Sequence, residues 1–396
     1  MTTIYLNQLG IISPLGNTVG ETKRRMLERV ESGVAPTDFY SAGHPLPLGR
    51  IDPALSLPPA ANLPWRARSR NNQLALAALN QIRPAVAGAI ERFGSHRVGI
   101  VIGTSTSGIA DGEKALREYG SSGILPSSFH YGQLELGSPA AALAQTLGTT
   151  GPAFTHSSAC ASSAKALASA ARLILMKGCD AVIAGGVDTL CAFTLAGFAA
   201  LESLSATRCN PLSRNRNGIN IGEGAALFLM SCQPAAIALC GWGESSDGHH
   251  MSAPDPAGVG ARMAMERALA RAGIGVAQVD YINLHGTATI QNDAMEARVV
   301  HALFGDRVSV SSTKPFTGHA LGAAGAIEAG LCWLAMQDDN PTGMLPPHLW
   351  DGVADPDLPE LNVAEPGASL GRSLRCVLSN SFAFGGANAT LVLRRE

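Results

Sequence analysis

The sequence predicts an α/β fold in which buried sheets are covered by helices. Short apolar runs rich in Val and Ile alternate along the 396 residues with longer stretches of helical spacing, and this alternation is typical of such folds. Glycine is frequent, with 44 residues, whereas aromatic residues make up only 5%. Small side chains therefore fill much of the interior, which favours closely packed helices and strands.

The first half is expected to contain two helices and four strands. The run after position 160 predicts a helix because Ala and Leu are strong helix formers, and Gly178 suits its C-terminal cap. The expected strands are 1–6, 97–103, 180–186 and 225–231, and the expected helices are 71–93 and 161–177.

The second half repeats this alternation. A helix is expected to end at Gly273, and a second Ala- and Gly-rich helix is expected late in the chain. The expected helices are 261–272, 293–304 and 318–336, and the expected strands are 279–284, 308–312, 374–380 and 389–394.

Each half has a strand, a turn with chemically reactive residues and a small-residue helix, which indicates an old duplication. We place the seam within 233–240, after the strand that ends near Ser231. This predicts a first domain over 1–235 and a second over 236–396. The proline-rich segments 44–64 and 341–366 are expected to be long surface loops.

Composition excludes several classes of protein. The formal net charge of −2 provides no general attraction to nucleic acid or to a membrane surface. No apolar run reaches the roughly 18 residues of a membrane span, and the start lacks the features of a signal peptide. The eight cysteines show no CxxC pair and no Cys/His metal spacing. We therefore expect a cytoplasmic protein with free thiols and no metal.

Cys160 is the predicted nucleophile. It lies in a Ser- and Ala-rich run just before the predicted helix 161–177, where the helix dipole and free N–H groups favour a thiolate. The backbone N–H of Cys160 is also placed to hold a developing oxyanion. A buried core cysteine is the alternative, and we expect that role for the other seven. His156 is expected to make a structural hydrogen bond.

Two histidines lie in glycine-containing turns far downstream. His285 and His319, as neutral Nε2–H donors, would stabilise the enolate formed when a malonyl group loses carbon dioxide. Thr287 and Thr289 carry hydroxyls suited to an amide-bearing pantetheine arm. For either histidine alone, a structural role is the alternative.

Charged residues near these turns have expected supporting roles. Lys314 and Glu328 flank His319 in the sequence, and a Lys–Glu pair there would orient that ring. Asp293 and Glu296 open the following helix and are expected to hold backbone N–H groups as caps.

A last motif runs from 380 to 388 and contains two phenylalanines and two adjacent glycines. Glycine lets the backbone approach a ligand closely. The Phe384 N–H would be a second oxyanion donor, and its ring would screen the thiol from water. Phe382 is assigned to the substrate pocket. A turn with core aromatic residues is the alternative.

Together these motifs resemble the elongating β-ketoacyl-[acyl carrier protein] synthases of the Cys-His-His kind, over nearly the whole chain. The resemblance implies a thiolase-like fold, with two similar halves in a five-layer αβαβα sandwich, and a dimer. It implies that Cys160 takes an acyl chain from its carrier and that His285 and His319 support decarboxylation of malonyl-carrier. Lys314 and Glu328 match the family's supporting pair, and Phe384 matches its gating phenylalanine. The substrates would be held on the phosphopantetheine of an acyl carrier protein, and no bound cofactor is expected.

Some positions depart from the family pattern. Ala383 replaces the first glycine of the usual Phe-Gly-Phe-Gly-Gly run, and its Cβ restricts φ > 0, so we expect a stiffer gate. Gly112 aligns with a bulky pocket gate, which would permit a longer acyl pocket. Asn210 and Ser213 replace an Arg and an Asp. These features resemble the ketosynthases of aryl polyene pigment clusters, where the catalytic chain can pair with a related subunit that lacks the nucleophile.

An acidic carrier protein requires a positive docking surface. Arg66, Arg68 and Arg70 form one candidate cluster, and Arg208 belongs to a second with Arg214 and Arg216. Singly, each is also explained as a solvated surface charge.

Three other functions are weighed against this one. A degradative thiolase needs a second catalytic cysteine, and Cys376 lies in a strand-like run instead. An initiating synthase uses Cys-His-Asn, whereas His319 supplies a second histidine. A non-catalytic chain-length partner would lack Cys160. The choice between a homodimer and a heterodimer stays open.

Overall fold

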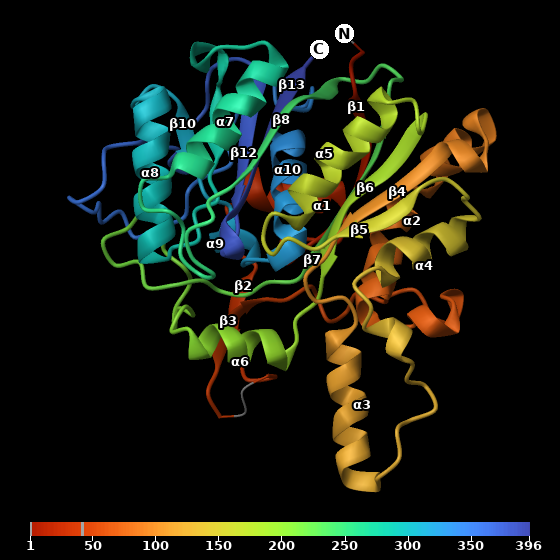
Figure 1. The fold of residues 1–396 in the computed structure, drawn as a ribbon. Helices are drawn as coiled ribbons and strands as arrows, with labels where there is room; N and C mark the ends of the chain where they lie inside the picture. The colour runs from red at the N-terminus through yellow and green to blue at the C-terminus, as the bar shows by residue number, and fades with distance from the viewer. Residues whose placement is uncertain (1, 41–42) are drawn as a thin grey trace.

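A mixed β-sheet runs through the centre of the molecule (Figure 1), in the order β11-β10-β9-β12-β13-β8-β1-β7-β6-β4-β5. The structure is a computed structural model that describes residues 2–40 and 43–396. The strands of one half are β1 (Tyr5–Ile12), β4 (Val98–Gly103), β5 (Ala153–His156), β6 (Ala181–Asp188) and β7 (Gly224–Ser231); those of the other are β8 (Ile237–Ser246), β9 (Tyr281–Asn283), β10 (Ser309–Ser311), β11 (Asn362–Val363), β12 (Cys376–Phe382) and β13 (Ala387–Arg395).

The two halves of the sheet have the same pairing pattern. From β1 outward, β7 and β6 pair antiparallel, and β4 and β5 then pair in parallel. From β8 outward, β13 and β12 pair antiparallel, and β9 and β10 then pair in parallel. The halves join where β1 meets β8, with Tyr5 opposite Ala238. This repetition agrees with the duplicated architecture that the sequence predicts.

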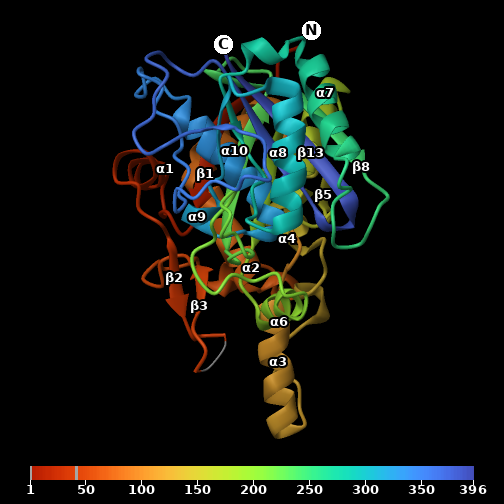
Figure 2. The same cartoon turned by 90° about the vertical axis from the view of Figure 1, so that its left-hand side faces the viewer.

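Helices cover both sides of each half-sheet, which produces five layers. Helices α5 (Ser162–Leu175) and α10 (Ala324–Ala335) pack against each other between the half-sheets. The outer layers are formed by α2 (Arg70–Phe93) with α4 (Ser138–Leu147), and by α7 (Val259–Ala272) with α8 (Ile290–Phe304), as Figure 2 shows for α7 and α8.

Small residues allow the central helices to touch. A Cβ built on Gly325 in α10 would lie 3.0 Å from the Cβ and backbone N of Ala164 in α5, and nearly all of α10 is buried. A larger side chain at either position would separate the two helices. The high Ala and Gly content of the sequence is therefore explained by this middle layer.

Shorter elements lie outside these layers. Helix α3 projects from the body, at the end opposite the two termini (Figures 1 and 2). The remaining elements are α1 (Val19–Lys23), a π-helical turn (Arg24–Glu28), the hairpin β2 (Val34–Thr37) and β3 (Leu46–Gly49), α3 (Ile109–Ser122), α6 (Ala192–Ala200) and α9 (Lys314–Thr317).

Most predicted helices and strands are found with small shifts, but the strand predicted over 1–6 is found at Tyr5–Ile12, and residue 1 of that prediction lies outside the described residues. The sequence did not predict α3, α4, α6, β5 or β8. Three further differences concern predicted segments. The helix predicted over 318–336 begins only at Ala324, because residues 318–320 form the turn of His319 and Leu321 has a φ of 47°. The predicted seam overlaps β8, so the connection between halves is 232–236. The segment 341–366 is not only a surface loop, since His348 is 1% exposed and bonds the Ser312 N–H and the Pro211 carbonyl.

Within the described residues, no helix is long and apolar enough to cross a membrane. All eight cysteines are free thiols, and most of them are buried.

Candidate active site

A tight turn between β5 and α5 presents Cys160. Ala159 has a left-handed φ of 47°, a strained conformation for a residue with a Cβ. The hydroxyl of Ser162 holds this turn by accepting from the Ser158 N–H at 2.8 Å and donating to the Ala159 carbonyl at 2.6 Å. The turn directs Cys160, which is 6% exposed, into a pocket.

The His319 turn is held by the backbone of 219–222. The His319 N–H donates to the Asn220 carbonyl at 2.7 Å, and the Gly222 N–H donates to the His319 carbonyl at 2.9 Å. A Cβ on Gly222 would lie 2.3 Å from the Thr317 carbonyl oxygen, which is too close for any side chain. Glycine is therefore required where this turn crosses the neighbouring strand.

The His285 turn is anchored by two carboxylates of α8. Glu296 accepts from the N–H groups of His285 and Gly286, both at 2.8 Å. Asp293 accepts from the Ala288 N–H of this turn at 3.2 Å and from the Leu212 N–H at 2.8 Å. Both residues hold backbone N–H groups, as expected, but those groups belong to other segments rather than to their own helix. Their role is to fix the His285 turn.

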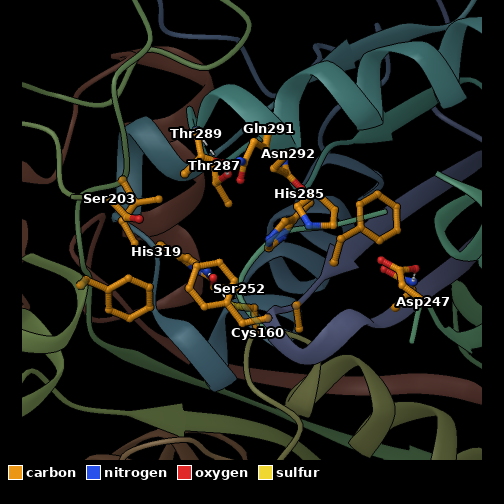
Figure 3. Close-up of a pocket in the computed structure, with 17 residues that line it drawn as sticks. Cys160, Ser203, Asp247, Ser252, His285, Thr287, Thr289, Gln291, Asn292 and His319 are labelled. Carbon is orange, nitrogen blue, oxygen red and sulfur yellow. Dashed lines mark hydrogen bonds between the residues drawn. The ribbon is translucent and has the colours of Figure 1, made fainter. Parts of the chain in front are cut away.

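The three chemically reactive side chains converge, as Figure 3 shows. His319 Nε2 lies 2.9 Å from Cys160 Sγ, and the two imidazole rings are 5.4 Å apart at 82°. One ligand atom from each of Cys160, His285 and His319 lies within 4.8 Å of the others. They face a pocket with about 620 Å³ of empty space. Cys160 thus forms one site with two histidines that lie more than 100 positions downstream in the chain.

Burial determines the protonation of this triplet. It raises the pKa of the Cys160 thiol to about 12, although the Lys314 charge and the Phe384 N–H act in the opposite direction. The expected stabilisation of the Cys160 thiolate by the helix N-terminus stays a prediction, and burial acts against that charged form. Burial, with the positive charge of Lys314, holds the pKa of His285 and of His319 well below the usual value. Both imidazoles are therefore neutral, as expected.

Lys314 and Glu328 form a buried ion pair, with side chains 1% and 2% exposed. The Lys314 ammonium also donates to the His285 carbonyl at 2.5 Å and lies 3.4 Å from His285 Nδ1. A cation beside Nδ1 leaves the ring proton on Nε2, which faces the pocket. The pair thus orients His285, whereas the sequence analysis assigned it to His319.

His319 is held differently. Its Nδ1 is buried and has no hydrogen-bond partner within residues 2–40 and 43–396. Nothing in that part of the chain therefore fixes which ring nitrogen carries the proton.

The gating motif lies over the thiol. The Phe384 N–H acts to lower the pKa of the Cys160 thiol, and the Phe384 ring lies 5.6 Å from that of Phe198. The Phe382 ring packs against His285 at 6.0 Å. Ala383 has a φ of −108°, so its Cβ causes no strain in this conformation; the positive φ values belong to Gly385 and Gly386.

Thr287 and Thr289 line the same pocket, with their hydroxyl oxygens 2.9 Å apart. Sequence reasoning missed several other lining residues. Gln291 and Asn292 directly follow the His285 motif, so their position was a usable signal. The loop near 247–254 carried no motif, and its residues became visible only in the fold. The missed polar residues are Ser203, Asp247, Ser252, Gln291 and Asn292.

Gly112 lies elsewhere. It is buried on α3, where a Cβ would lie 2.6 Å from Leu134 Cδ2, and it does not line this pocket. Leu134 lies in the space that a side chain at this position would take, and the part of Gly112 in a longer acyl pocket stays a prediction.

Some of the candidate docking arginines are exposed, whereas others form ion pairs with carboxylates of this chain. Arg66, Arg68 and Arg208 are exposed. Arg70 donates to both oxygens of the buried Glu223, at 2.6 and 3.0 Å. Arg216 is 7% exposed and pairs with Asp355. A guanidinium already committed to an internal carboxylate is poorly placed to meet an acidic partner.

Known protein families were compared with this fold and site. The model described as "Beta-ketoacyl synthase, N-terminal domain" matches residues 69–235, and "Beta-ketoacyl synthase, C-terminal domain" matches residues 237–349. The chain belongs to the β-ketoacyl synthase family. The family, the thiolase-like fold and the condensing acyltransferase class that the sequence predicts are thereby confirmed.

Individual relatives agree with this membership. The 3-oxoacyl-[acyl-carrier-protein] synthase 2 of Coxiella burnetii is 33% identical over 99% of this chain and 98% of its own. Nodulation protein E of Rhizobium meliloti is 35% identical over 76% of each chain. Among solved structures, the ketosynthase ApeO in complex with its chain length factor ApeC, from Xenorhabdus doucetiae, is 42% identical. It has a TM-score of 0.93 and covers 100% of this chain and 98% of that one.

Proposed function

We propose that this β-ketoacyl synthase holds an acyl group on Cys160 and condenses it with a malonyl unit carried on the phosphopantetheine of an acyl carrier protein. The observation that carries the proposal is the convergence of one thiol, two neutral imidazoles and two backbone N–H groups in one pocket. These are the groups that acyl transfer and decarboxylation require.

Acyl loading uses Cys160 and His319. As the sulfur attacks the acyl thioester, its proton passes to His319 Nε2 at 2.9 Å. The N–H groups of Cys160 and Phe384 hold the oxyanion. The carrier thiolate then leaves and takes the proton, which restores neutral His319. A neutral thiol and a nearby neutral base suit this step, because a proton can move as the bond forms.

Condensation uses both histidines as donors. Loss of carbon dioxide from the malonyl thioester leaves an enolate, whose oxygen accepts from Nε2–H of His285 and His319. The enolate carbon attacks the acyl carbonyl on Cys160, and the Cys160 thiolate leaves and takes up a proton from solvent, which restores the neutral thiol. His319 accepts a proton at Nε2 in the first step and donates there in the second. Its unpartnered Nδ1 permits this change of tautomer.

The partner that we propose is a second ketosynthase-like subunit, identical or related. Helices α3 and α6 expose large apolar side chains, including Leu116 at 66% and Phe193 at 69%, and exposed apolar patches of this kind mark interfaces. The edge strand β5 pairs only with β4 among the described residues. Phe198 of α6 lines the pocket, so a subunit covering α6 would reach the acyl chain.

The sequence features that resemble aryl polyene ketosynthases, with the similarity to a ketosynthase solved with a chain length factor, support that pathway and a heterodimer. Carrier docking is proposed at the exposed Arg66, Arg68 and Arg208. Arg70 is excluded from this surface by its bond to Glu223.

Intact-mass spectrometry after incubation with an acyl carrier donor tests the function. The wild-type chain is expected to gain one acyl group, and Cys160→Ala to gain none. The exposed Cys232 provides a matched control, because Cys232→Ala should load like the wild type. Acyl loading that survives in Cys160→Ala would overturn the assignment.

A further inference from the structure

A buried carboxylate lies between the nucleophile turn and the His319 turn. Asp188 ends β6 and is 0% exposed. Its Oδ1 accepts from the Thr104 hydroxyl at 2.6 Å and from the N–H and hydroxyl of Thr106, both at 2.8 Å. Its Oδ2 accepts from the Gly322 N–H at 2.6 Å, and the Ser105 N–H reaches both oxygens at 2.9 and 3.0 Å.

No lysine, arginine or histidine within residues 2–40 and 43–396 forms an ion pair with Asp188. Burial raises the pKa of this carboxyl, and the donors of Thr104, Ser105 and Thr106 act in the opposite direction. A buried carboxylate without a cation is costly unless several donors surround it. Asp188 accepts hydrogen bonds from several neutral donors instead of pairing with a cation. This arrangement indicates that its role is to hold those donor groups in place.

The contacts of Asp188 lead to both reacting groups. Ser105, held by Asp188, donates its hydroxyl to the carbonyl of Ala159 at 3.3 Å, and Ala159 directly precedes Cys160. On the other side, Gly322 follows His319 by three residues. A Cβ on Gly322 would lie 2.8 Å from Asp188 Oδ2 and 2.7 Å from the Ser105 hydroxyl. Asp188 and Ser105 of the first half of the chain are therefore in close contact with Gly322 of the second half.

We propose that Asp188 is a positioning residue that keeps His319 in register with Cys160 by linking the Gly322 backbone to the β4–α3 connection. The inference rests on the proposed function, since it assigns the residue to the same two-step reaction. Asp188 touches neither substrate nor the reacting atoms, and it acts through backbone groups.

The substitution Asp188→Asn should break the hydrogen bond to Gly322 while it keeps those to Thr104 and Thr106. The amide oxygen can keep the donors of Thr104 and Thr106, but the amide nitrogen then faces the Gly322 N–H as a second donor. The nucleophile turn therefore stays supported while the His319 turn loses its acceptor. Because solvent can accept the thiol proton when His319 is displaced, acyl loading is expected to stay within about threefold of the wild type. Condensation, which needs the Nε2–H donor of His319 at the enolate oxygen, is expected to fall about tenfold to hundredfold.

Gly322→Ala perturbs the same contact from the other side, since its methyl group would press on Asp188 and Ser105. It is expected to show the same selective loss of condensation. Asp280→Asn is the matched control. Asp280 also accepts two backbone N–H groups, from Arg375 and Cys376, but it lies before β9, whose far end leads to His285. Both of its rates should match the wild type.

The experiment measures acyl loading by intact mass and condensation by formation of the β-ketoacyl product, with melting temperature recorded for each variant. A selective loss of condensation in Asp188→Asn or Gly322→Ala supports the inference. Equal losses in both steps, or no loss in either, would show a purely structural role and overturn it. If Asp188→Asn does not fold, the loading and condensation rates of Gly322→Ala decide whether the inference holds. Wild-type protein that fails to load would overturn the proposed function as well, which separates the two failures.

Discussion

His319 Nε2 and Cys160 Sγ lie 2.9 Å apart although 159 residues separate them in the chain. The thiol proton therefore has an acceptor in contact, and no separate base needs to approach during acyl loading. Because burial disfavours both the thiolate and the imidazolium, the pair rests in its neutral form.

The first prediction concerns the pH dependence of thiol reactivity. Burial raises the pKa of Cys160 to about 12, and only the thiolate reacts with iodoacetamide. Alkylation of Cys160 should therefore rise roughly tenfold per pH unit between about pH 7 and 9. Peptide mass spectrometry follows Cys160, with the exposed Cys232 as internal reference. A plateau below pH 8 would contradict a neutral resting thiol.

The second prediction separates the two chemical steps at His319. His319→Ala removes one of two donors to the enolate, so condensation should fall by about a hundredfold or more. Loading should persist, because solvent can accept the thiol proton in place of the ring. The two steps are measured as acyl mass gain and β-ketoacyl product. Loss of loading together with condensation would mean that His319 is indispensable as a base.

The third prediction concerns the buried pair of Lys314 and Glu328. Glu328→Gln leaves the Lys314 ammonium buried without a counter-charge, which should lower the free energy of unfolding by about 3–5 kcal/mol. The double variant Lys314→Met, Glu328→Leu should regain much of that stability, because an apolar pair carries no desolvation cost.

Urea unfolding measures this third effect. Condensation should stay low in the double variant, since His285 loses the cation beside Nδ1. A double variant with wild-type condensation would show that the pair serves stability alone.

The fourth prediction concerns Glu296. Burial raises its pKa to about 7, well above the ordinary value of a glutamate carboxyl. The folded state therefore holds this proton more tightly than the unfolded state does. Stability from this group is complete below the unfolded pKa and declines as pH rises through about 7.

Thermal unfolding across this pH range tests the fourth prediction. Glu296→Gln should remove the decline, so its stability should vary less than that of the wild type between about pH 5 and 7, by up to about 3 kcal/mol. Parallel pH curves for the two proteins would contradict the raised pKa.

Local patterns in the sequence were enough to place most helices and strands, and the motifs were enough to select Cys160, His285 and His319. Alternating apolar runs reflect burial on the faces of a sheet, and each such pattern depends only on residues within its own segment. The helix expected over 318–336 failed for a different reason. The turn of His319 is held by hydrogen bonds from 219–222, which no local pattern reveals.

The roles of individual side chains depended on neighbours that are distant in the chain. Lys314 lies against His285 rather than His319, and the space beside Gly112 is bordered by Leu134. The role of a charged residue or of a glycine depends on the residues that pack beside it in the folded chain. Composition and periodicity describe how each segment meets water and the interior, whereas pKa values and contacts arise when folding removes water and brings remote segments together.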